Sequence, residues 1–207
     1  MVYTVFVIHP AYVIGIDEVG RGPLAGPVTV CACAIPADFD LSRFAGIKDS
    51  KKLTSKKREE WFAVISDMKG RGELDFAFTS IPADEIDAIG IAVAIQRALD
   101  VSLDAVLSSF GLAPESVEVL LDGSLHAPER FTRQEAIIKG DEKVPVISAA
   151  SIVAKVMRDR HMDEMDAVHP GYGLVKHKGY GTAAHCAAIR KLGPSPIHRR
   201  SFLRNFL

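Results

Sequence analysis

The sequence predicts an α/β fold, in which helices pack against a β-sheet. Two short apolar runs have the length of buried strands, and each ends in an acidic residue, at Asp17 and at Asp122. Between these runs, residues 82–111 carry apolar side chains at helical spacing, and a similar spacing returns after residue 148. Strands that alternate with helices are typical of this fold class.

Length and composition fit one globular domain, or one domain with a helical appendage: 207 residues, 48% of them hydrophobic and 25% charged. The first ten residues are apolar, but they lack a basic leader and are too short to span a bilayer. We interpret Cys31, Cys33 and Cys186 as buried or incidental thiols in a reducing compartment, and we expect the cytoplasm. The net charge of −1 does not itself argue for a nucleic-acid partner.

The first predicted strand, residues 12–16, ends at Asp17 and Glu18 and leads into the turn Gly20-Arg21-Gly22-Pro23. Neighbouring side chains of a regular strand point to opposite faces, so both acids reach one site only if Glu18 lies where the strand breaks into the turn. Adjacent carboxylates repel each other unless a cation lies between them, and Mg²⁺ or Mn²⁺ suits such a site. The alternative is an ordinary acidic surface turn. A phosphate-binding P-loop is excluded, because Arg-Gly stands where that motif needs Lys and Ser/Thr.

Four further elements are expected to form the scaffold. Residues 28–35 alternate loosely and predict a strand that pairs with the first in a hairpin, and residues 74–79 alternate as a half-buried strand does. A helix can begin at Pro82, and its apolar stripe runs from Ile91 to Phe110, after which Gly111 can close it. A last helix is predicted from about Ser148, and its alanines would let it pack closely against the sheet.

A basic segment lies between these elements, at residues 47–58, with six basic residues against one acid. Thr54 or Ser55 can cap a helix that follows, with apolar positions at helical spacing. The segment is either a solvated basic face or a phosphate-binding surface that includes Lys51 and Lys52.

The second acid-bearing strand, residues 117–121, ends in Asp122-Gly123. Ligands gather outside the carboxyl ends of parallel strands, so Asp17 and Asp122 converge if the two strands are parallel neighbours. A lone Asp-Gly is more commonly a simple turn, but the matching acid at Asp17 favours a shared site. Asp141, just before the last helix, is placed to reach the same edge of the sheet.

The tail, residues 169–207, is rich in Gly, Pro, His, Lys and Arg. Its basic residues interleave with Tyr172, Tyr180 and Phe202, which suits a nucleic-acid strand through phosphate contacts and ring stacking. A plain basic loop region is the alternative.

Together these motifs closely resemble those of the bacterial type 2 ribonucleases H, the ribonuclease HII family. The matching segments occur in the family's order and span nearly the whole chain: residues 15–28, 49–53, 121–123, 139–141, 148–159, 178–182 and 198–202. The first segment and residues 148–152 are highly specific, whereas residues 121–123 alone would be weak. The related type 3 enzymes usually carry Lys at the position of Arg21, so the chain resembles type 2.

The resemblance implies a ribonuclease H-like mixed sheet flanked by helices, in one catalytic domain over residues 1–207. Residues 165–207, roughly, would form a helical C-terminal extension that contacts the substrate. It implies an endoribonuclease, acting in DNA replication and repair, that hydrolyses the RNA strand of RNA–DNA hybrids and incises 5′ of single ribonucleotides in duplex DNA. The family's four metal-site acids map onto Asp17, Glu18, Asp122 and Asp141, which are expected to hold two Mg²⁺ or Mn²⁺ ions.

The resemblance also assigns substrate contacts. Gly20, Arg21 and Gly22 would contact the 2′-OH and neighbouring phosphates, and Tyr180 would sense the 2′-OH, which distinguishes RNA from DNA at one position. We expect a monomer with no membrane partner. The family's clamp-binding segments lie at the chain end, so residues 201–207 either contact a sliding clamp or dock on their own domain.

Two other classes of function fit parts of the sequence. A non-catalytic nucleic-acid-binding module would use the basic segments in a salt-sensitive way that ignores the carboxylates. A phosphatase or other small-substrate metal hydrolase would use the acids but needs no extended cationic track. Cleavage of a duplex DNA that contains one ribonucleotide, with and without Mn²⁺, separates the three.

Overall fold

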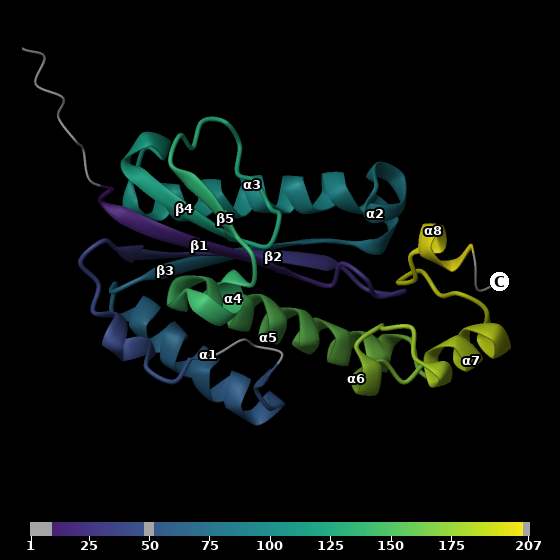
Figure 1. Ribbon diagram of the computed structural model, residues 1–207. Coiled ribbons are helices and arrows are strands. Elements are labelled where there is room, and N and C mark those ends of the chain that lie inside the picture. Colours follow the sequence, from purple (N-terminus) through teal and green to yellow (C-terminus); the bar gives the residue numbers. More distant parts are fainter. Residues whose placement is uncertain (1–9, 48–51, 205–207) are drawn as a thin grey trace, which may run out of the picture.

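The computed structural model describes residues 10–47 and 52–204. A five-stranded sheet lies between two layers of helices (Figure 1). The strand order is β3-β2-β1-β4-β5, and the strands are β1 (Tyr12–Val19), β2 (Val28–Pro36), β3 (Asp75–Ile81), β4 (Val117–Asp122) and β5 (Gln134–Ile137). The strand β1 is antiparallel to β2 and parallel to β4, so the sheet is mixed and its first two strands form the predicted hairpin.

The helices divide between the two faces of the sheet and the tail. On one face lie α2 (Ala83–Ile89) and α3 (Ile91–Phe110), and on the other lie α1 (Ser55–Gly70) and α5 (Pro145–Val168) (Figure 1). The single turn α4 (Gly140–Lys143) precedes α5, which continues past residue 165. The tail then forms α6 (Leu174–His177), α7 (Ala183–Leu192) and α8 (Arg200–Leu203). Among the described residues, no helix is both long enough and apolar enough to cross a bilayer.

Side chains of the strands alternate between the two faces of the sheet, so a separate hydrophobic cluster lies on each face. Ile14 and Ile16 of β1 pack with α3 on one face. Cys31 and Cys33 of β2 point to the other face, toward α1 and α5, and both are buried, as predicted. A third cluster, which includes Leu24, joins the tail to the turn after β1.

The helix α5 lies very close to β1. A Cβ atom at Gly15 would lie 2.5 Å from the carbonyl carbon of Val146, so only glycine permits this approach. The buried alanines Ala149 and Ala150 continue the contact, which confirms the predicted close packing. The helix begins at Pro145, earlier than the predicted Ser148, because proline at the first helical position needs no N–H partner.

Local signals placed other elements correctly, with two exceptions. The helix expected from Pro82 to Gly111 is divided into α2 and α3, because Gly90 between them has a φ of 81°, which no α-helix accommodates. Thr54 caps α1 by accepting a hydrogen bond from the Lys57 N–H, and α3 ends at Gly111 with a φ of 62°. In β3 the expected inward alternation holds for Phe76, which packs near α1, but not for Phe78. That side chain is 38% exposed, because β3 is an edge strand and Phe78 lies farther along it.

Candidate active site

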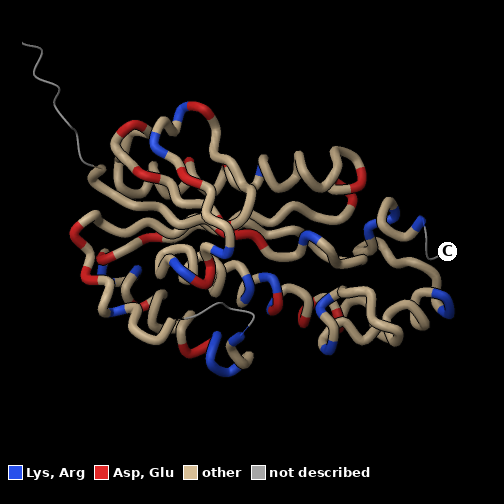
Figure 2. The backbone as a smooth tube through the Cα atoms, in the orientation of Figure 1, with Lys and Arg blue, Asp and Glu red and all other residues tan. Residues whose placement is uncertain are grey.

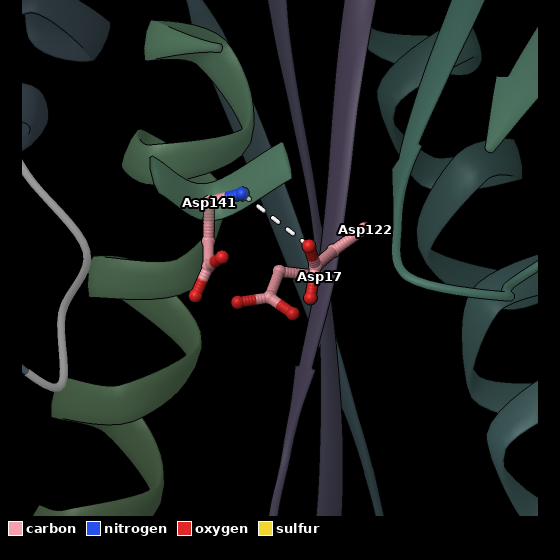
Figure 3. A group of neighbouring side chains, drawn as sticks. All are labelled: Asp17, Asp122 and Asp141. Carbon is pink, nitrogen blue, oxygen red and sulfur yellow. Dashed lines mark hydrogen bonds between the residues drawn. The ribbon is translucent and has the colours of Figure 1, made fainter. Parts of the chain in front are cut away.

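Three aspartates meet at one edge of the sheet. Asp17 lies on β1, Asp122 ends β4, and Asp141 lies on α4. One carboxylate oxygen of each lies within 4.8 Å of the others (Figure 3). The parallel register pairs Ile16 with Leu121, so the aspartate that follows each of them is brought beside the other. The two strands are thus the parallel neighbours that the convergence of Asp17 and Asp122 required.

Asp122 also determines where Asp141 lies. Its Oδ1 accepts a hydrogen bond from the backbone N–H of Gly140 at 2.7 Å. The same oxygen accepts one from the backbone N–H of Asp141 at 3.3 Å, which Figure 3 shows as a dashed line. A Cβ atom at Gly140 would lie 2.7 Å from Cδ1 of Ile147 and 3.5 Å from Oδ1 of Asp122, so a larger residue here would displace the Ile147 side chain. The hydroxyl of Ser148 donates to the carbonyl oxygen of Asp141 at 2.7 Å and ties α4 to α5. The Asp141 carboxylate therefore points toward Asp17.

The cluster concentrates negative charge in a buried place. Asp17 is only 3% exposed, and burial raises the pKa of its carboxyl well above the ordinary value. The charges of Glu18 and Asp122 raise that pKa further, while a hydrogen bond from Ser151 lowers it. Carboxylate oxygens are the ligands of hard divalent cations such as Mg²⁺ and Mn²⁺. The donor set and its excess negative charge therefore fit a divalent metal ion.

The end of the first strand lies beyond the position that the sequence predicted, and this affects Glu18. The strand β1 does not break at Glu18 but continues to Val19, because the hairpin pairs Glu18 with Val30 of β2. Among the described residues, the carboxylate oxygens that lie within 4.8 Å of one another come from Asp17, Asp122 and Asp141, and none comes from Glu18. Glu18 nevertheless lines the same cavity as Asp17, and its Oε1 lies 3.6 Å from Nη1 of Arg21.

A groove leads away from the acids. A cavity of about 310 Å³ adjoins them and is lined by Asp17, Glu18, Val19, Arg58, Ser151, Lys155 and Tyr180. A second cavity, of about 440 Å³, shares Arg58, Lys155 and Tyr180 with the first and adds Lys176 and Lys178. Figure 2 shows basic positions at the start of α1, along α5 and around α6, near the acidic end of β1. The carboxylates thus open onto a cationic surface.

The turn after β1 has one glycine that the fold requires and one that it does not. Gly20 has a φ of 90°, and a Cβ atom there would lie 2.3 Å from Nε of Arg158. At Gly22, a Cβ atom would meet nothing within 4 Å. The side chain of Arg21 is 57% exposed.

The other predicted substrate contacts are more dispersed. Tyr180 is 41% exposed and lines both cavities. The Nζ of Lys52 lies 2.6 Å from Oε2 of Glu142, one residue beyond Asp141. Lys51 lies outside the described residues.

Sequence reasoning missed several residues at this site. Ser151 is buried and forms a hydrogen bond with Asp17. Its polar side chain within a mostly apolar stretch of α5 could have indicated a role at the site. Arg158 and Arg199 are fully buried beneath the turn. No local signal could identify these two, because arginine is normally exposed and each donates to backbone carbonyls of the loop after β1, more than a hundred positions away.

Comparison with known proteins finds one family that matches nearly the whole described chain. Residues 14–205 match the family model described as Ribonuclease HII. The Ribonuclease HII of Shouchella clausii is 45% identical over 191 residues, covering 92% of this chain and 68% of the relative. That of Coxiella burnetii is 43% identical over 189 residues, covering 91% of this chain and 86% of the relative.

Solved structures share the fold. A chain of the PCNA:RNase HII complex from Archaeoglobus fulgidus matches with a TM-score of 0.68 and 27% identity, covering 91% of this chain and 94% of that chain. The ribonuclease H2 of Pyrococcus horikoshii matches with a TM-score of 0.67 and 26% identity, covering 94% and 96%. The predicted ribonuclease H-like α/β fold is confirmed, and the chain belongs to the ribonuclease HII family of type 2 ribonuclease H endoribonucleases.

Proposed function

We propose that this protein hydrolyses the RNA strand of RNA–DNA hybrids and incises duplex DNA on the 5′ side of single embedded ribonucleotides. The products would carry 3′-OH and 5′-phosphate ends. One observation carries the proposal: Asp17, in a cluster of three aspartates, shares a cavity with Tyr180, and that cavity continues into a cationic groove.

Asp17, Asp122 and Asp141, with Glu18 beside them, are the residues that would hold the metal, as two Mg²⁺ or Mn²⁺ ions when substrate is bound. Such ions lower the pKa of a water molecule and stabilise charge on the leaving oxygen of a phosphodiester. The raised pKa of Asp17 and the all-carboxylate donor set support this assignment. The chain itself orients the Asp17 carboxylate, through the Glu18 N–H at 2.7 Å and through Ser151.

The remaining residues would position the nucleic acid. The turn Gly20-Arg21-Gly22 follows the acids directly along the chain, and Tyr180 lines the cavity beside them, so we assign recognition of the 2′-OH to these two elements. Arg58, Lys155, Lys176 and Lys178 would neutralise phosphates along the groove. We extend the same phosphate role to Lys51 and Lys52.

The proposal includes a cellular location and a protein partner. With DNA as its substrate, the protein would act in the bacterial cytoplasm, in ribonucleotide and primer removal. The relative from Archaeoglobus fulgidus was solved in a complex with PCNA, which supports a sliding-clamp contact through residues 201–207 here. Leu203 of that segment is buried in the tail, so the clamp would bind other side chains of the segment.

The test uses three substrates of one sequence: a duplex DNA with a single ribonucleotide, an RNA–DNA hybrid and an all-DNA duplex. Each is incubated with the full chain in Mg²⁺, in Mn²⁺ or with a chelator. We expect a single incision just before the ribonucleotide, cleavage of the hybrid, and no cleavage of the all-DNA duplex or in chelator. Equal cleavage of the all-DNA duplex contradicts the role given to Tyr180 and the turn.

A further inference from the structure

We propose that two adjacent residues of the tail, His198 and Arg199, are positioning residues that hold the two ribonucleotide-sensing elements in register. Arg199 orients the turn Gly20-Arg21-Gly22, and His198 fixes the backbone at Tyr180. This inference rests on the proposed function of those two elements.

Arg199 is fully buried beneath the turn. Its Nη2 donates to the carbonyl oxygen of Gly20 at 2.6 Å, its Nη1 to that of Arg21 at 3.1 Å, and its Nε to that of Gly26 at 2.9 Å. Burial lowers the pKa of Arg199 to about 9, so the guanidinium is still charged at neutral pH. One cation therefore holds three carbonyl groups of the loop that follows β1.

The direction of these carbonyls determines where the turn's N–H groups point. In a trans peptide the C=O and the N–H point in opposite directions, and no described peptide bond is cis. Because the carbonyls of Gly20 and Arg21 face Arg199, the N–H groups of Arg21 and Gly22 face away from it, on the exposed side of the turn. Successive N–H groups directed the same way form an anion-binding concavity, which suits a substrate phosphate.

His198 reaches Tyr180 through His185, and the hydrogen bonds determine both tautomers. The Ser195 N–H donates to Nδ1 of His198 at 3.0 Å, so a neutral His198 carries its proton on Nε2. That N–H donates to Nε2 of His185 at 3.1 Å. His185 then carries its own proton on Nδ1 and donates to the carbonyl oxygen of Tyr180 at 3.0 Å. This chain of neutral groups is the His198–His185 relay, and both of its rings are buried.

Backbone geometry lets neighbouring residues serve two different elements. Arg199 has extended dihedrals, φ −79° and ψ 97°, and successive side chains of an extended segment point in opposite directions. Its N–H donates to the Leu24 carbonyl oxygen at 2.8 Å. The Leu24 N–H in turn donates to the carbonyl oxygen of Gly179, the neighbour of Tyr180, at 2.8 Å. The segment after the turn is thus held between the Tyr180 loop and the His198-Arg199 pair.

The first variant is Arg199→Lys, which keeps the charge but replaces the planar fork of donors by one ammonium group. We expect KM for the single-ribonucleotide duplex to rise by about 10-fold or more, because charged hydrogen bonds to the turn are lost. The kcat at saturating substrate should change much less, and the affinity of the metal site for Mn²⁺ without substrate should not change.

The second test is a pair of variants at His198. In His198→Asn the side-chain oxygen can still accept from Ser195, but the side chain is too short to reach His185. In His198→Gln the amide can donate to His185. We expect His198→Asn to lose preference for the single-ribonucleotide duplex over the all-DNA duplex, and His198→Gln to recover most of it. A merely structural histidine would not show this order of rescue.

The stability control is Leu103→Ala, a truncation in the core cluster between the sheet and α3, which contains no residue of the turn and neither His198 nor Arg199. It should lower Tm yet leave KM and the substrate preference unchanged. If Arg199→Lys and His198→Asn behave like this control, the inference is overturned while the proposed function stands. If the wild type cleaves hybrid but not the single-ribonucleotide duplex, the proposed incision at single ribonucleotides fails, and the inference about its sensing elements fails with it. If Arg199→Lys does not fold, the His198 pair decides.

Discussion

The carboxylate of Asp122 accepts a 2.7 Å hydrogen bond from the backbone N–H of Gly140. This contact joins the end of β4 to the start of α4 and so carries Asp141 to the acids of the sheet (Figure 3). One acid of the site is thus also the anchor of another, and the cluster depends on packing between elements as well as on their sequences.

Asp122→Asn separates these two roles. Asparagine keeps an oxygen that can accept the Gly140 N–H, so α4 should stay in place, but the ligand charge is lost. Metal ions contribute several kcal/mol to transition-state stabilisation, so we expect kcat to fall by about 10³-fold or more. Hybrid binding in a gel-shift assay should persist, and near-normal turnover in Mg²⁺ or Mn²⁺ would falsify the assignment.

Asp17→Asn should stabilise the metal-free protein while abolishing cleavage. Burial and nearby acids raise the pKa of Asp17, so the folded state resists its ionisation. Stability is therefore lost as the pH rises above the ordinary pKa of 3.8, and asparagine removes that cost. In chelator at neutral pH we expect the variant's Tm to exceed that of wild type by about 2–4 °C. Mn²⁺ should raise the wild-type Tm only; a lower Tm for the variant contradicts this account.

The two glycines of the turn should behave differently. Gly20→Ala places a side chain 2.3 Å from Nε of Arg158 at a φ of 90°, so we expect a clear loss of Tm. Gly22→Ala meets nothing within 4 Å and should melt like wild type. Any loss of activity in Gly22→Ala then reports on the approach of substrate. Equal melting temperatures for the two variants would contradict the backbone conformation of Gly20 and its close contact with Arg158.

Tyr180→Phe tests recognition of the 2′-OH without disturbing the fold. The ring is 41% exposed, so its hydroxyl contributes little to stability, and phenylalanine keeps the stacking surface. We expect cleavage at a single ribonucleotide to fall by about 3- to 10-fold, the value of one hydrogen bond. Cleavage of a long hybrid should also fall, because its RNA strand carries a 2′-OH at every position, and a thermal melt equal to that of wild type serves as the control for folding. Unchanged kinetics on both substrates would exclude the hydroxyl from recognition.

Stability should depend on pH through the His198–His185 relay. Burial, aided by the nearby His185, lowers the pKa of His198 from 6.5 to about 4, and burial also lowers the pKa of His185. His169 and His177 near His198 act in the same direction. The unfolded chain takes up protons below about pH 6.5 that the folded chain resists, so stability declines from there toward pH 4. Thermal melts should show a steeper decline for wild type than for His198→Gln, and parallel curves would contradict the neutral relay.

Local patterns predicted the elements well, because helix caps and strand alternation depend on neighbouring residues. Thr54 caps α1, Gly111 ends α3, and Cys31 and Cys33 share a buried face, as their positions in the sequence indicate. Glu18 could not be placed this way. Its strand continues because Val30 pairs with it across the hairpin, and that pairing is a contact between strands.

The sequence by itself determined that acidic residues would follow two buried strands, that a glycine turn would come next, and that a basic tail would close the chain. Only the tertiary structure decided which carboxylate oxygens come together, because their separation depends on the register of β1 with β4 and on the Asp122–Gly140 contact. It also decided that Arg199 lies beneath the turn. The physical reason is the same in both cases: these contacts join residues far apart in the chain, and packing sets their distances.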